Sequence, residues 1–408
     1  MESERPLPEG ADLSKGPGRR GHLCPSCGAA GVSIFYEVEQ VPAHSVLLMP
    51  TQTAALDYPR GDVVLGFCRG CGFISNVAFN PEMSEYSSRY EETQGFSPTF
   101  NAFHRGLAGR LIERHDLHGK EIVEIGCGKG EFLTLLCELG GNRGVGFDPA
   151  YVSERNRSEA RDQITFIKDF YSEKYAHHRG DFICCKMTLE HIPRPAELVS
   201  VLRRSIGDRR DTVLFFQVPD VTRILREGAF WDIYYEHCSY FSPGSLARLF
   251  RRCGFDIIAI ERDYGGQYLM IEGRPGDGAS SGVQEDDLEA LACDVAHFFR
   301  DARRQLDTWR RTLRRLSQDG RRAVLWGSGS KGVAFLTALG VRDEIAYAVD
   351  INPYRNGTYM AGTGQKIVSP CFLREYRPDV VIAMNPMYRE EILWDLRQMG
   401  LSSEVITV

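Results

Sequence analysis

The sequence lacks an uninterrupted apolar run close to the roughly 20 residues that a membrane-spanning helix needs, although hydrophobic residues make up 43% of its 408 positions. It also lacks a long basic block, and its net charge is −6. These absences argue against a membrane partner and against a surface that follows nucleic-acid phosphates. No charged-then-apolar leader opens the chain, and no internal repeat is present. We therefore expect a cytoplasmic protein of two or three domains, present as a monomer or homodimer.

Changes in composition divide the chain into five predicted segments. Apolar runs such as EIVEI, RGVGF and TVLFFQV alternate with helical patterns, which predicts an α/β fold with a parallel sheet covered on both faces. GRPGDGASSG at 273–282 predicts a flexible break, and a helix over 284–318 has its apolar residues at helical spacing: Leu288, Leu291, Val295, Phe298 and Phe299. The expected segments are a disordered tail (1–21), a cysteine-bearing module (22–80), a central α/β domain (81–274), a linker with a helical spacer (275–320) and a shorter C-terminal α/β domain (321–408).

Four of the twelve cysteines form two CxxC pairs. Cys24 and Cys27 are followed by Gly28, and Cys68 and Cys71 by Gly72. Two residues between cysteines let a tight turn point both sulfurs at one ion, and four thiolates complete the tetrahedral shell of structural zinc. Such a shell has no open position for a catalytic water. The alternative is a set of buried or redox-active cysteines.

A glycine-rich loop follows the strand EIVEI. It reads Glu124-Ile-Gly126-Cys-Gly128-Lys-Gly130 and opens a helix, and Asp148 ends the next strand. Glycines let the backbone approach a ligand, and a helix N-terminus favours negative charge. A carboxylate about 20 residues later is suited to ribose hydroxyls, so the pattern predicts a nucleoside cofactor. A nicotinamide dinucleotide is the runner-up.

A second loop of this type lies near the end of the chain. Gly327-Ser-Gly329-Ser-Lys331-Gly332 follows AVLW, and Asp350 ends the next strand. This is a dinucleotide fingerprint, but the remaining length is about half of a complete dinucleotide domain. Backbone amides and Lys331 suit a pyrophosphate. The alternatives are a lobe that only closes the cleft and true nicotinamide binding.

One stretch is dense in aromatic and titratable residues. It runs FWDIYYEHCSYFSP and contains Tyr234, Glu236 and His237. It follows a strand, and α/β sheets build their sites at such places. A histidine beside a carboxylate can act as a general base near neutral pH. The alternative is that the aromatic residues pack the loop and His237 caps a helix.

Two of these motifs resemble the class I methyltransferases, in VEIGCGKGEFL and VGFDPA. The resemblance implies S-adenosylmethionine as cofactor, bound by the loop and by Asp148. Asp169 and Phe170 lie where that family contacts the adenine, and Leu189-Glu-His191-Ile resembles a segment that lines its methyl-transfer cleft. The cofactor contacts implied are Glu124, Gly126, Gly128, Asp148, Asp169 and Phe170.

The whole assembly, about residues 22–408, resembles the sugar C-methyltransferases that act on thymidine-diphosphate-linked 4-keto sugars. That family has a four-cysteine zinc module, a class I core and a C-terminal Rossmann-like domain, in that order. Tyr234, Glu236 and His237 match its active-site stretch. The resemblance implies that His237 removes a proton from the carbon beside a ketone, while Tyr234 and Glu236 orient substrate or base. It also implies that the C-terminal domain holds the nucleotide of the acceptor.

Two departures bear on the acceptor. Tyr235 replaces the family's first signature histidine, and a downstream His-Gly-Gly-Ser stretch reads YGGQY from Tyr264. We expect substrate contacts at both places and at the second loop: Tyr235, Tyr264, Gly329, Lys331 and Asp350. The first hypothesis is C-methylation of a nucleotide-linked keto sugar or similar carbonyl compound. The others are O- or N-methylation of a secondary-metabolite or polysaccharide precursor, and a binding protein with a vestigial methyltransferase core.

Overall fold

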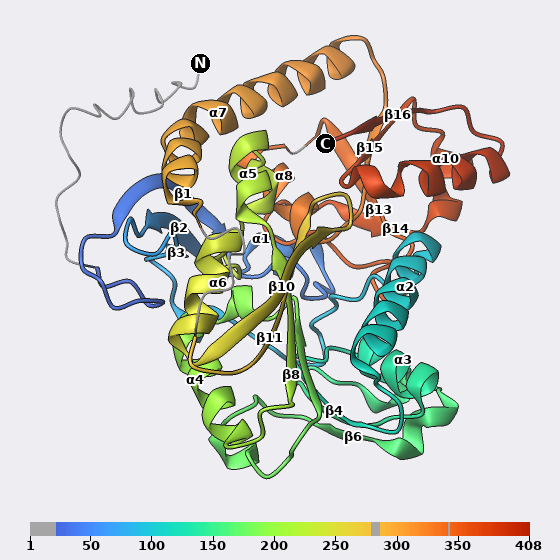
Figure 1. The fold of residues 1–408 in the computed structure, drawn as a ribbon. Helices are drawn as coiled ribbons and strands as arrows, with labels where there is room; N and C mark the ends of the chain where they lie inside the picture. Colours follow the sequence, from blue (N-terminus) through green and yellow to red (C-terminus); the bar gives the residue numbers. More distant parts are fainter. Residues whose placement is uncertain (1–21, 279–285, 342) are drawn as a thin grey trace.

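The computed structural model describes residues 22–278, 286–341 and 343–408 (Figure 1). The predicted tail, 1–21, and residues 279–282 of the predicted break lie outside the described residues. The first part of that break, Gly273–Pro275, belongs instead to a strand. The described residues form three sheets, of four, seven and five strands. The predicted α/β fold class is confirmed.

The seven-stranded sheet has the order β10-β11-β8-β7-β4-β5-β6. Its strands β4 to β8 are parallel, and β11 is antiparallel to both of its neighbours. From β4 the chain adds β5 and β6 on one side of the sheet, and it then crosses to the other side of β4 to add β7 and β8. A topological switch point therefore lies between β4 and β7. The strands are β4 (Glu121–Ile125), β5 (Arg143–Phe147), β6 (Ile164–Ile167), β7 (Phe182–Lys186), β8 (Val213–Pro219), β10 (Phe255–Asp263) and β11 (Tyr268–Pro275).

Helices cover both faces of this sheet because alternate strand residues point to opposite sides. Ile122 and Phe182 pack with α2 (Pro98–His115) and α3 (Glu131–Gly140). Val123 and Ile183, one position later in each strand, pack with α4 (Pro195–Ile206) and α6 (Pro243–Arg252). The continuous apolar runs of the sequence therefore form strands that are buried on both faces.

The four-stranded sheet combines distant parts of the chain. It contains β1 (Ser33–Pro42), β2 (Arg60–Phe67), β3 (Ile74–Asn76) and β9 (Ser239–Tyr240), all antiparallel. A short helix, α1 (Gln52–Leu56), lies between β1 and β2. The pair Ile74 and Tyr240 joins β3 to β9. The cysteine-bearing segment is thereby paired with the backbone immediately after His237.

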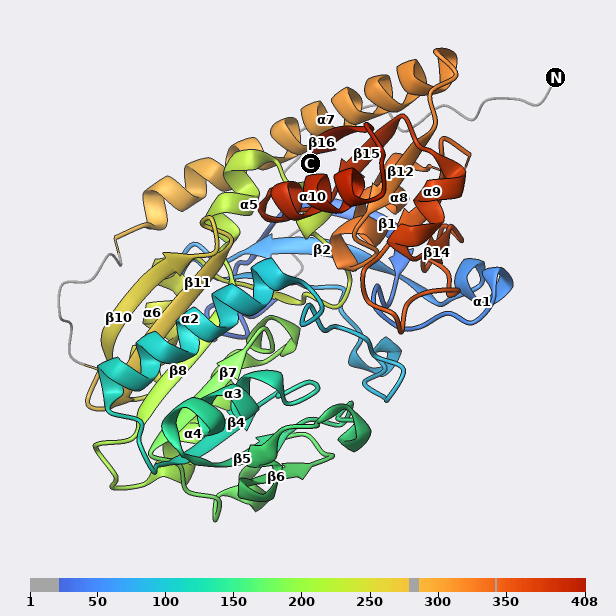
Figure 2. The same ribbon diagram turned by 90° about the vertical axis from the view of Figure 1, so that its right-hand side faces the viewer.

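The five-stranded sheet is parallel, in the order β14-β13-β12-β15-β16. Figure 2 shows its elements at one end of the molecule and β4 to β6 at the other. The elements are β12 (Ala323–Trp326), α8 (Ser330–Leu339), β13 (Ile345–Val349), β14 (Lys366–Val368), α9 (Leu373–Tyr376), β15 (Val380–Ala383), α10 (Arg389–Gln398) and β16 (Glu404–Thr407).

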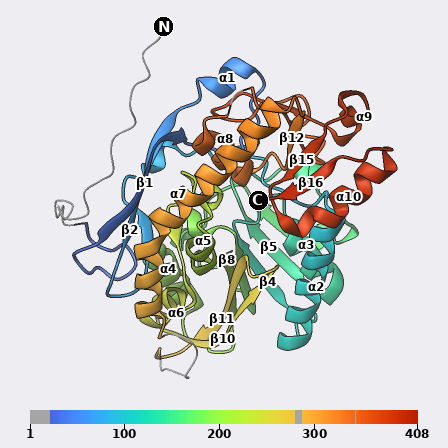
Figure 3. The ribbon, with the colours of Figure 1, turned by 90° about the horizontal axis from the view of Figure 1, so that it is seen from above.

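One long helix, α7 (Leu288–Gln318), crosses the molecule (Figure 3). It contacts β1, α8 and the short α5 (Val221–Glu227). Leu291, Val295 and Phe298 are buried in the shared core, whereas Phe299 is 50% exposed. Of the five apolar positions in the sequence pattern, Leu288, Leu291, Val295 and Phe298 therefore lie on the packed side of the helix or at its edge, and Phe299 lies outside it. None of the helices in the described ranges is long and apolar enough to cross a membrane.

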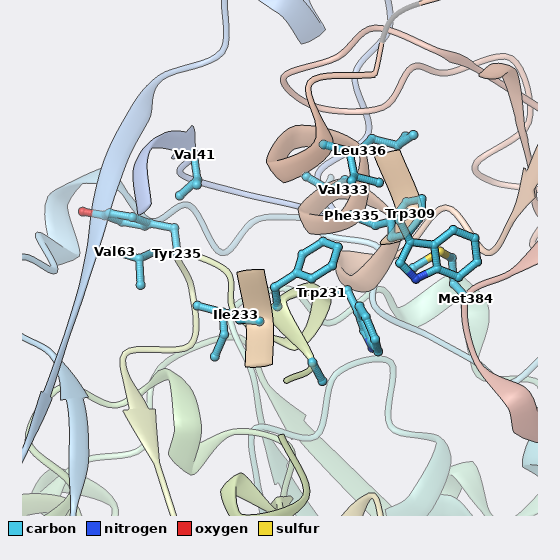
Figure 4. Packing of buried hydrophobic residues seen from close by; sticks show 14 of the residues in the cluster. Val41, Val63, Trp231, Ile233, Tyr235, Trp309, Val333, Phe335, Leu336 and Met384 are labelled. Carbon is cyan, nitrogen blue, oxygen red and sulfur yellow. The ribbon is translucent and has the colours of Figure 1, made fainter. Parts of the chain in front are cut away.

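A single hydrophobic cluster ties the first and third sheets together. It includes Val41 and Val63 from the first sheet, Trp231 from the stretch before β9, and Phe335 from α8 (Figure 4). Burial of aromatic and branched side chains is the main favourable term in folding. This cluster therefore fixes the stretch containing His237 against the C-terminal domain.

Candidate functional site

A cavity of about 730 Å³ lies where the carboxyl ends of the parallel strands of the seven-stranded sheet face those of the five-stranded sheet. The loops after β4, β5, β6 and β7 line one end, and the loops after β12 and β13 line the other. Residues 84–97, which we call the strap, contribute Tyr86, Tyr90, Glu92 and Gln94 to its wall. Both predicted glycine loops therefore open into the same cavity, as expected for sites at the carboxyl ends of parallel strands.

The first glycine loop leaves β4 in a conformation that requires glycine. Gly126 has φ of 68° and Gly128 has φ of 54°. A Cβ at Gly126 would overlap the side chain of Thr188, so no other residue fits there without displacement. Glu124 lies behind the loop, where its Oε2 accepts a hydrogen bond from Leu133 N at 3.0 Å. Burial raises the pKa of Glu124 to about 8.

Asp148, at the end of β5, closes the loop from the other side. Its Oδ2 accepts from Gly128 N at 2.9 Å and its Oδ1 from Ala150 N at 2.7 Å. Burial raises the pKa of this carboxyl, against the effect of these two hydrogen bonds. Each oxygen keeps a second lone pair, so the carboxylate can still accept from two ligand hydroxyls.

Asp169 and Phe170 follow β6 at the rim of the cavity. The Asp169 carboxylate accepts from Tyr175 Oη at 2.8 Å and from Lys174 Nζ at 2.5 Å. Hydrogen bonds from Lys174 and Tyr175 lower its pKa. Phe170 is 59% exposed. Asp169 and Phe170 line the same cavity as the first glycine loop. The cavity wall therefore includes an aromatic ring and a second carboxylate in addition to that of Asp148.

The strap is anchored to both α/β units. Lys129 Nζ donates to Tyr90 O at 2.7 Å, which fixes the strap on the first glycine loop. The buried Glu91 pairs with Arg155 and accepts from Asn352 Nδ2 at 2.8 Å. The strap therefore contacts both the first glycine loop and the C-terminal domain.

His237 and Tyr234 meet inside the cavity. Their ring centres are 4.1 Å apart, and both residues line the wall. His237 is 4% exposed, and its Nδ1 has no hydrogen-bond partner among the described residues. Burial lowers its pKa well below the usual value, with a further effect of His191. The ring is therefore neutral at pH 7 and able to accept a proton.

Glu236 points away from the cavity. Its carboxylate accepts from His44 Nδ1 at 3.1 Å and from Ser45 N at 2.8 Å. Ser45 Oγ also bonds to Ser330 Oγ of α8 at 2.8 Å. Burial acts to raise the pKa of Glu236, but the bonds from His44 and Ser45 outweigh it and lower the pKa. Glu236 therefore joins the N-terminal segment, the His237 stretch and the C-terminal domain, and does not face the cavity.

Two expected substrate contacts, Tyr235 and Tyr264, are not on the cavity wall. Tyr235 lies beside Val63 (Figure 4), and its hydroxyl accepts from Asn80 N at 2.8 Å. Tyr264 stacks on Tyr268 with ring centres 4.9 Å apart. Tyr234 and Tyr268 lie on the cavity wall instead.

The second glycine loop lines the opposite end of the cavity. Asp350 accepts from Ser328 N at 3.0 Å and from Asn352 N at 2.9 Å, the same pattern as Asp148 in the first loop. Within the part of the chain that the structure describes, no side chain caps α8, and a Cβ at Gly329 would meet no atom within 4 Å. The start of this helix is therefore accessible from the cavity.

Lys331 lies in a network rather than free above this loop. Its Nζ donates to Gln267 Oε1 at 2.9 Å and is 3.2 Å from Asp232 Oδ1. Asp232 also pairs with Arg223. Gln267 and Asn385 exchange hydrogen bonds of 3.0 and 3.1 Å. Burial lowers the pKa of Lys331, against the attraction of Asp232.

The four cysteines of the CxxC pairs converge. Their sulfurs all lie within 4.8 Å of one another, and Cys24 Sγ is 3.6 Å from Cys71 Sγ. Gly28 N and Gly72 N each donate to the carbonyl of the first cysteine of their pair, at 2.7 and 2.8 Å. These turns aim both sulfurs of a pair at one point, and the sulfur-only donor set suits zinc.

Sequence reasoning missed several residues of the wall. Tyr86 of the strap bonds to His191 Nδ1 at 3.1 Å. Lys186, at the end of β7, bonds to His104 Nε2 at 2.7 Å, and burial lowers its pKa to about 8. For Glu190, the sequence shows only its place in the Leu189–Ile192 motif. A charged residue inside the apolar run DFICCKM was the available signal for Lys186.

Family comparisons match two parts of the chain. Residues 100–260 match a family described as a methyltransferase domain. Residues 284–403 match a family described as a C-methyltransferase C-terminal domain. The C-methyltransferase NovU of Streptomyces niveus is 27% identical over 309 residues, which cover 71% of this chain and 72% of that protein.

Shorter matches involve the core alone. The ubiquinone biosynthesis O-methyltransferase of Escherichia fergusonii is 27% identical over 119 residues, 28% of this chain and 50% of that protein. The chain thus spans about half the length of those relatives. Among solved structures, an N,N-8-amino-8-demethyl-D-riboflavin dimethyltransferase from Streptomyces davawensis has 19% identity and a TM-score of 0.34, over 42% of this chain and 55% of that one.

Proposed function

This chain belongs to the S-adenosylmethionine-dependent C-methyltransferases, and from that premise we propose that it methylates a carbon atom beside a carbonyl group in a nucleotide-linked keto-deoxysugar or a similar small molecule. Activation by a neighbouring carbonyl is what makes such a carbon acidic enough to be deprotonated by a side chain. One observation carries the proposal: His237 has an unpartnered ring nitrogen in a cavity that also contains both glycine loops.

The residues at the cofactor end fit S-adenosylmethionine. The turn at Gly126 and Gly128 puts the backbone of the first glycine loop on the cavity wall, where it suits the methionine part, and the Asp148 carboxylate has lone pairs for both ribose hydroxyls. Phe170 and Asp169 are suited to the adenine. When bound, the cofactor supplies an electrophilic methyl group on a positively charged sulfur. Burial raises the pKa of Glu92 to about 7 and that of Glu124 to about 8, and a cation bound beside them would favour their ionised form.

The protein residues move one proton and place one carbon atom. His237 removes the proton from the carbon beside the carbonyl, and the electrons of that bond pass to the carbonyl oxygen. These electrons would then be available to form a carbon–carbon bond with the methyl group that the bound cofactor would supply, and the sulfur would keep the electron pair of the bond it gives up. Tyr234, whose ring lies 4.1 Å from that of His237, confines the acceptor against the base.

The C-terminal domain, residues 321–408, anchors the acceptor. The open N-terminus of α8 and the free space at Gly329 suit the diphosphate of a nucleotide sugar. Asp350 shares the geometry of Asp148 and suits the ribose of that nucleotide. Lys331 is held by Asp232 and Gln267 and forms part of the cavity wall between the two ends.

The module at residues 22–80 holds one structural zinc ion through Cys24, Cys27, Cys68 and Cys71. The four converging sulfurs support this assignment. A shell of four thiolates leaves no position for water, so the ion stabilises the fold and takes no part in methyl transfer.

The identity of the methylated atom tests the function. With thymidine-diphosphate-4-keto-6-deoxyglucose as acceptor and methyl-labelled S-adenosylmethionine, we expect a product whose new methyl carbon is bonded to carbon, detected by two-dimensional NMR. A product with its new methyl group on oxygen or nitrogen would rule out C-methylation and support the O- or N-methylation hypothesis. Calorimetry without any affinity for S-adenosylmethionine would favour a non-catalytic binding protein.

The two glycine loops provide a matched pair of variants. Asp148→Asn is expected to weaken S-adenosylhomocysteine binding at least about tenfold, because a hydrogen bond to a charged group contributes about 1.5–3 kcal/mol. Asp350→Asn changes the equivalent carboxylate of the second loop and should leave this affinity unaltered. Isothermal titration calorimetry measures both. Equal losses in the two variants, or none in Asp148→Asn, would contradict the assignment of the first loop to the cofactor.

A further inference from the structure

Glu190 is a buried carboxyl group that the proposed reaction has not used. It lies in η5 (Leu189–His191), the short turn after β7, and lines the cavity. It is 1% exposed, and neither of its side-chain oxygens has a hydrogen-bond partner among the residues that the structure describes. A buried polar group without a partner has lost its hydrogen bonds to water with nothing in exchange, so a functional partner is expected for this carboxyl group.

The nearest basic group to this carboxyl is the ring of His237. Glu190 Oε1 lies 4.0 Å from His237 Nε2, and His237 Nδ1 has no partner. Glu236, the carboxylate adjacent in sequence, is engaged by His44 and Ser45 and does not reach the ring. A small rotation of the Glu190 side chain would bring its oxygen within hydrogen-bond distance of Nε2.

We propose that Glu190 is the carboxylate partner of His237, so that the two side chains act as one base. Nε2–H of His237 donates to the Glu190 carboxylate, and Nδ1 takes the proton from the acceptor carbon. The resulting imidazolium is then paired with a carboxylate instead of standing alone in a buried site. This pairing rests on the proposed function, and it makes Glu190 a positioning residue that acts through His237.

The electrostatics of the cavity give this pair a distinctive pH dependence. Burial raises the pKa of Glu190 to about 8 and lowers that of His237. The fraction of Glu190 in the carboxylate form, which stabilises the imidazolium, therefore increases as pH rises through about 8. The rate of methyl transfer should increase with it. The groups around the pair are Tyr86 of the strap, Cys185 of β7, His191, Tyr234 and Cys238 of the neighbouring turns, Tyr268 of β11, and Lys331 with Asp232.

Glu190→Gln and Glu190→Asp test the pair kinetically. Losing the carboxylate partner of a catalytic histidine lowers kcat by up to about 10⁴ in serine proteases, and we expect at least about a hundredfold loss in Glu190→Gln. The rise in rate near pH 8 should disappear in Glu190→Gln and return, with part of the activity, in Glu190→Asp. Glu236→Gln, as the matched control, should keep this rise whatever its effect on stability.

A measurement without acceptor separates this pairing from the proposed function. Nitrogen-15 NMR of labelled histidine, with His237 assigned by its loss in His237→Gln, should show a step near pH 8 that Glu190→Gln removes. The pairing is overturned if His237 titrates identically in the two proteins, or if Glu190→Gln keeps the wild-type pH profile. A second tightly bound metal ion per chain that Glu190→Gln loses would also overturn it, because the ion would separate the two side chains. If the NMR step is present but no acceptor carbon is methylated, the proposed function fails and the pairing stands.

Discussion

Replacing His237 with glutamine is expected to lower methyl transfer by 10²–10⁴-fold, the range that general-base catalysis contributes. Glutamine keeps a polar side chain of similar length but cannot accept a proton at neutral pH. Because His237 lies at the wall and outside the first glycine loop, binding of S-adenosylhomocysteine should stay within about twofold. The rate of methyl transfer and calorimetry of cofactor binding provide the two measurements.

The control for this substitution is His297→Gln, which changes an exposed histidine on α7 far from the cavity wall. We expect wild-type turnover for it. Incorporation of deuterium at the acceptor carbon in the absence of cofactor gives a further check, since it needs only the base. His237 would lose its role if the glutamine variant retained turnover within about threefold of the wild type, or exchanged deuterium at the wild-type rate.

Removing the zinc site should be the second large effect. The double change of Cys24 and Cys27 to serine is expected to eliminate bound zinc and methyl transfer together. Structural zinc contributes about 10–16 kcal/mol of binding free energy in small domains. The four-stranded sheet beside the cysteines also pairs with the segment that follows His237. Strand β3 pairs with β9 through Ile74 and Tyr240, three residues after His237. Elemental analysis, thermal melting and the rate of methyl transfer measure the three consequences.

Cys293→Ser and Cys371→Ser are the matched controls, because both cysteines are exposed and lie outside the cluster. Each should keep one zinc ion per chain and full activity. Zinc-free wild-type protein, prepared with a chelator, should lose activity and regain it when Zn²⁺ is added back. A zinc-free protein with undiminished melting temperature and activity would refute a structural role for the metal.

The two glycine loops were accessible to sequence reasoning because their constraints are local. A tight turn after a strand needs glycine where φ is positive, as at Gly126 and Gly128, and the carboxylate that closes the loop lies on the next strand, as Asp148 does. The same local rule applied to Asp350. The orientation of the two sulfurs within each CxxC pair follows equally from turn geometry, whereas the meeting of the two pairs joins residues 41 to 47 positions apart. The loops and the turns depend on short spacings that a sequence displays directly.

The assignment of side chains in the His237 stretch was less accessible. Four successive polar and aromatic residues, 234 to 237, were expected to contribute to one site. The structure turns Tyr234 and His237 toward the cavity, Tyr235 toward Val63, and Glu236 toward His44. Which way each residue faces depends on the pairing of β9 with β3 and on the core beneath it, and neither is visible in a short motif.

The sequence by itself determined the α/β class, the two glycine loops and the two CxxC pairs, because each arises from spacings of a few residues and from the hydrophobic period. Only the tertiary structure decided that both loops open into one cavity, that Glu190 rather than Glu236 lies next to His237, and that the strap spans the two ends. The physical reason is that these contacts join residues 47 to 261 positions apart along the chain. Packing of the whole core brings them together, and no local preference encodes such distances.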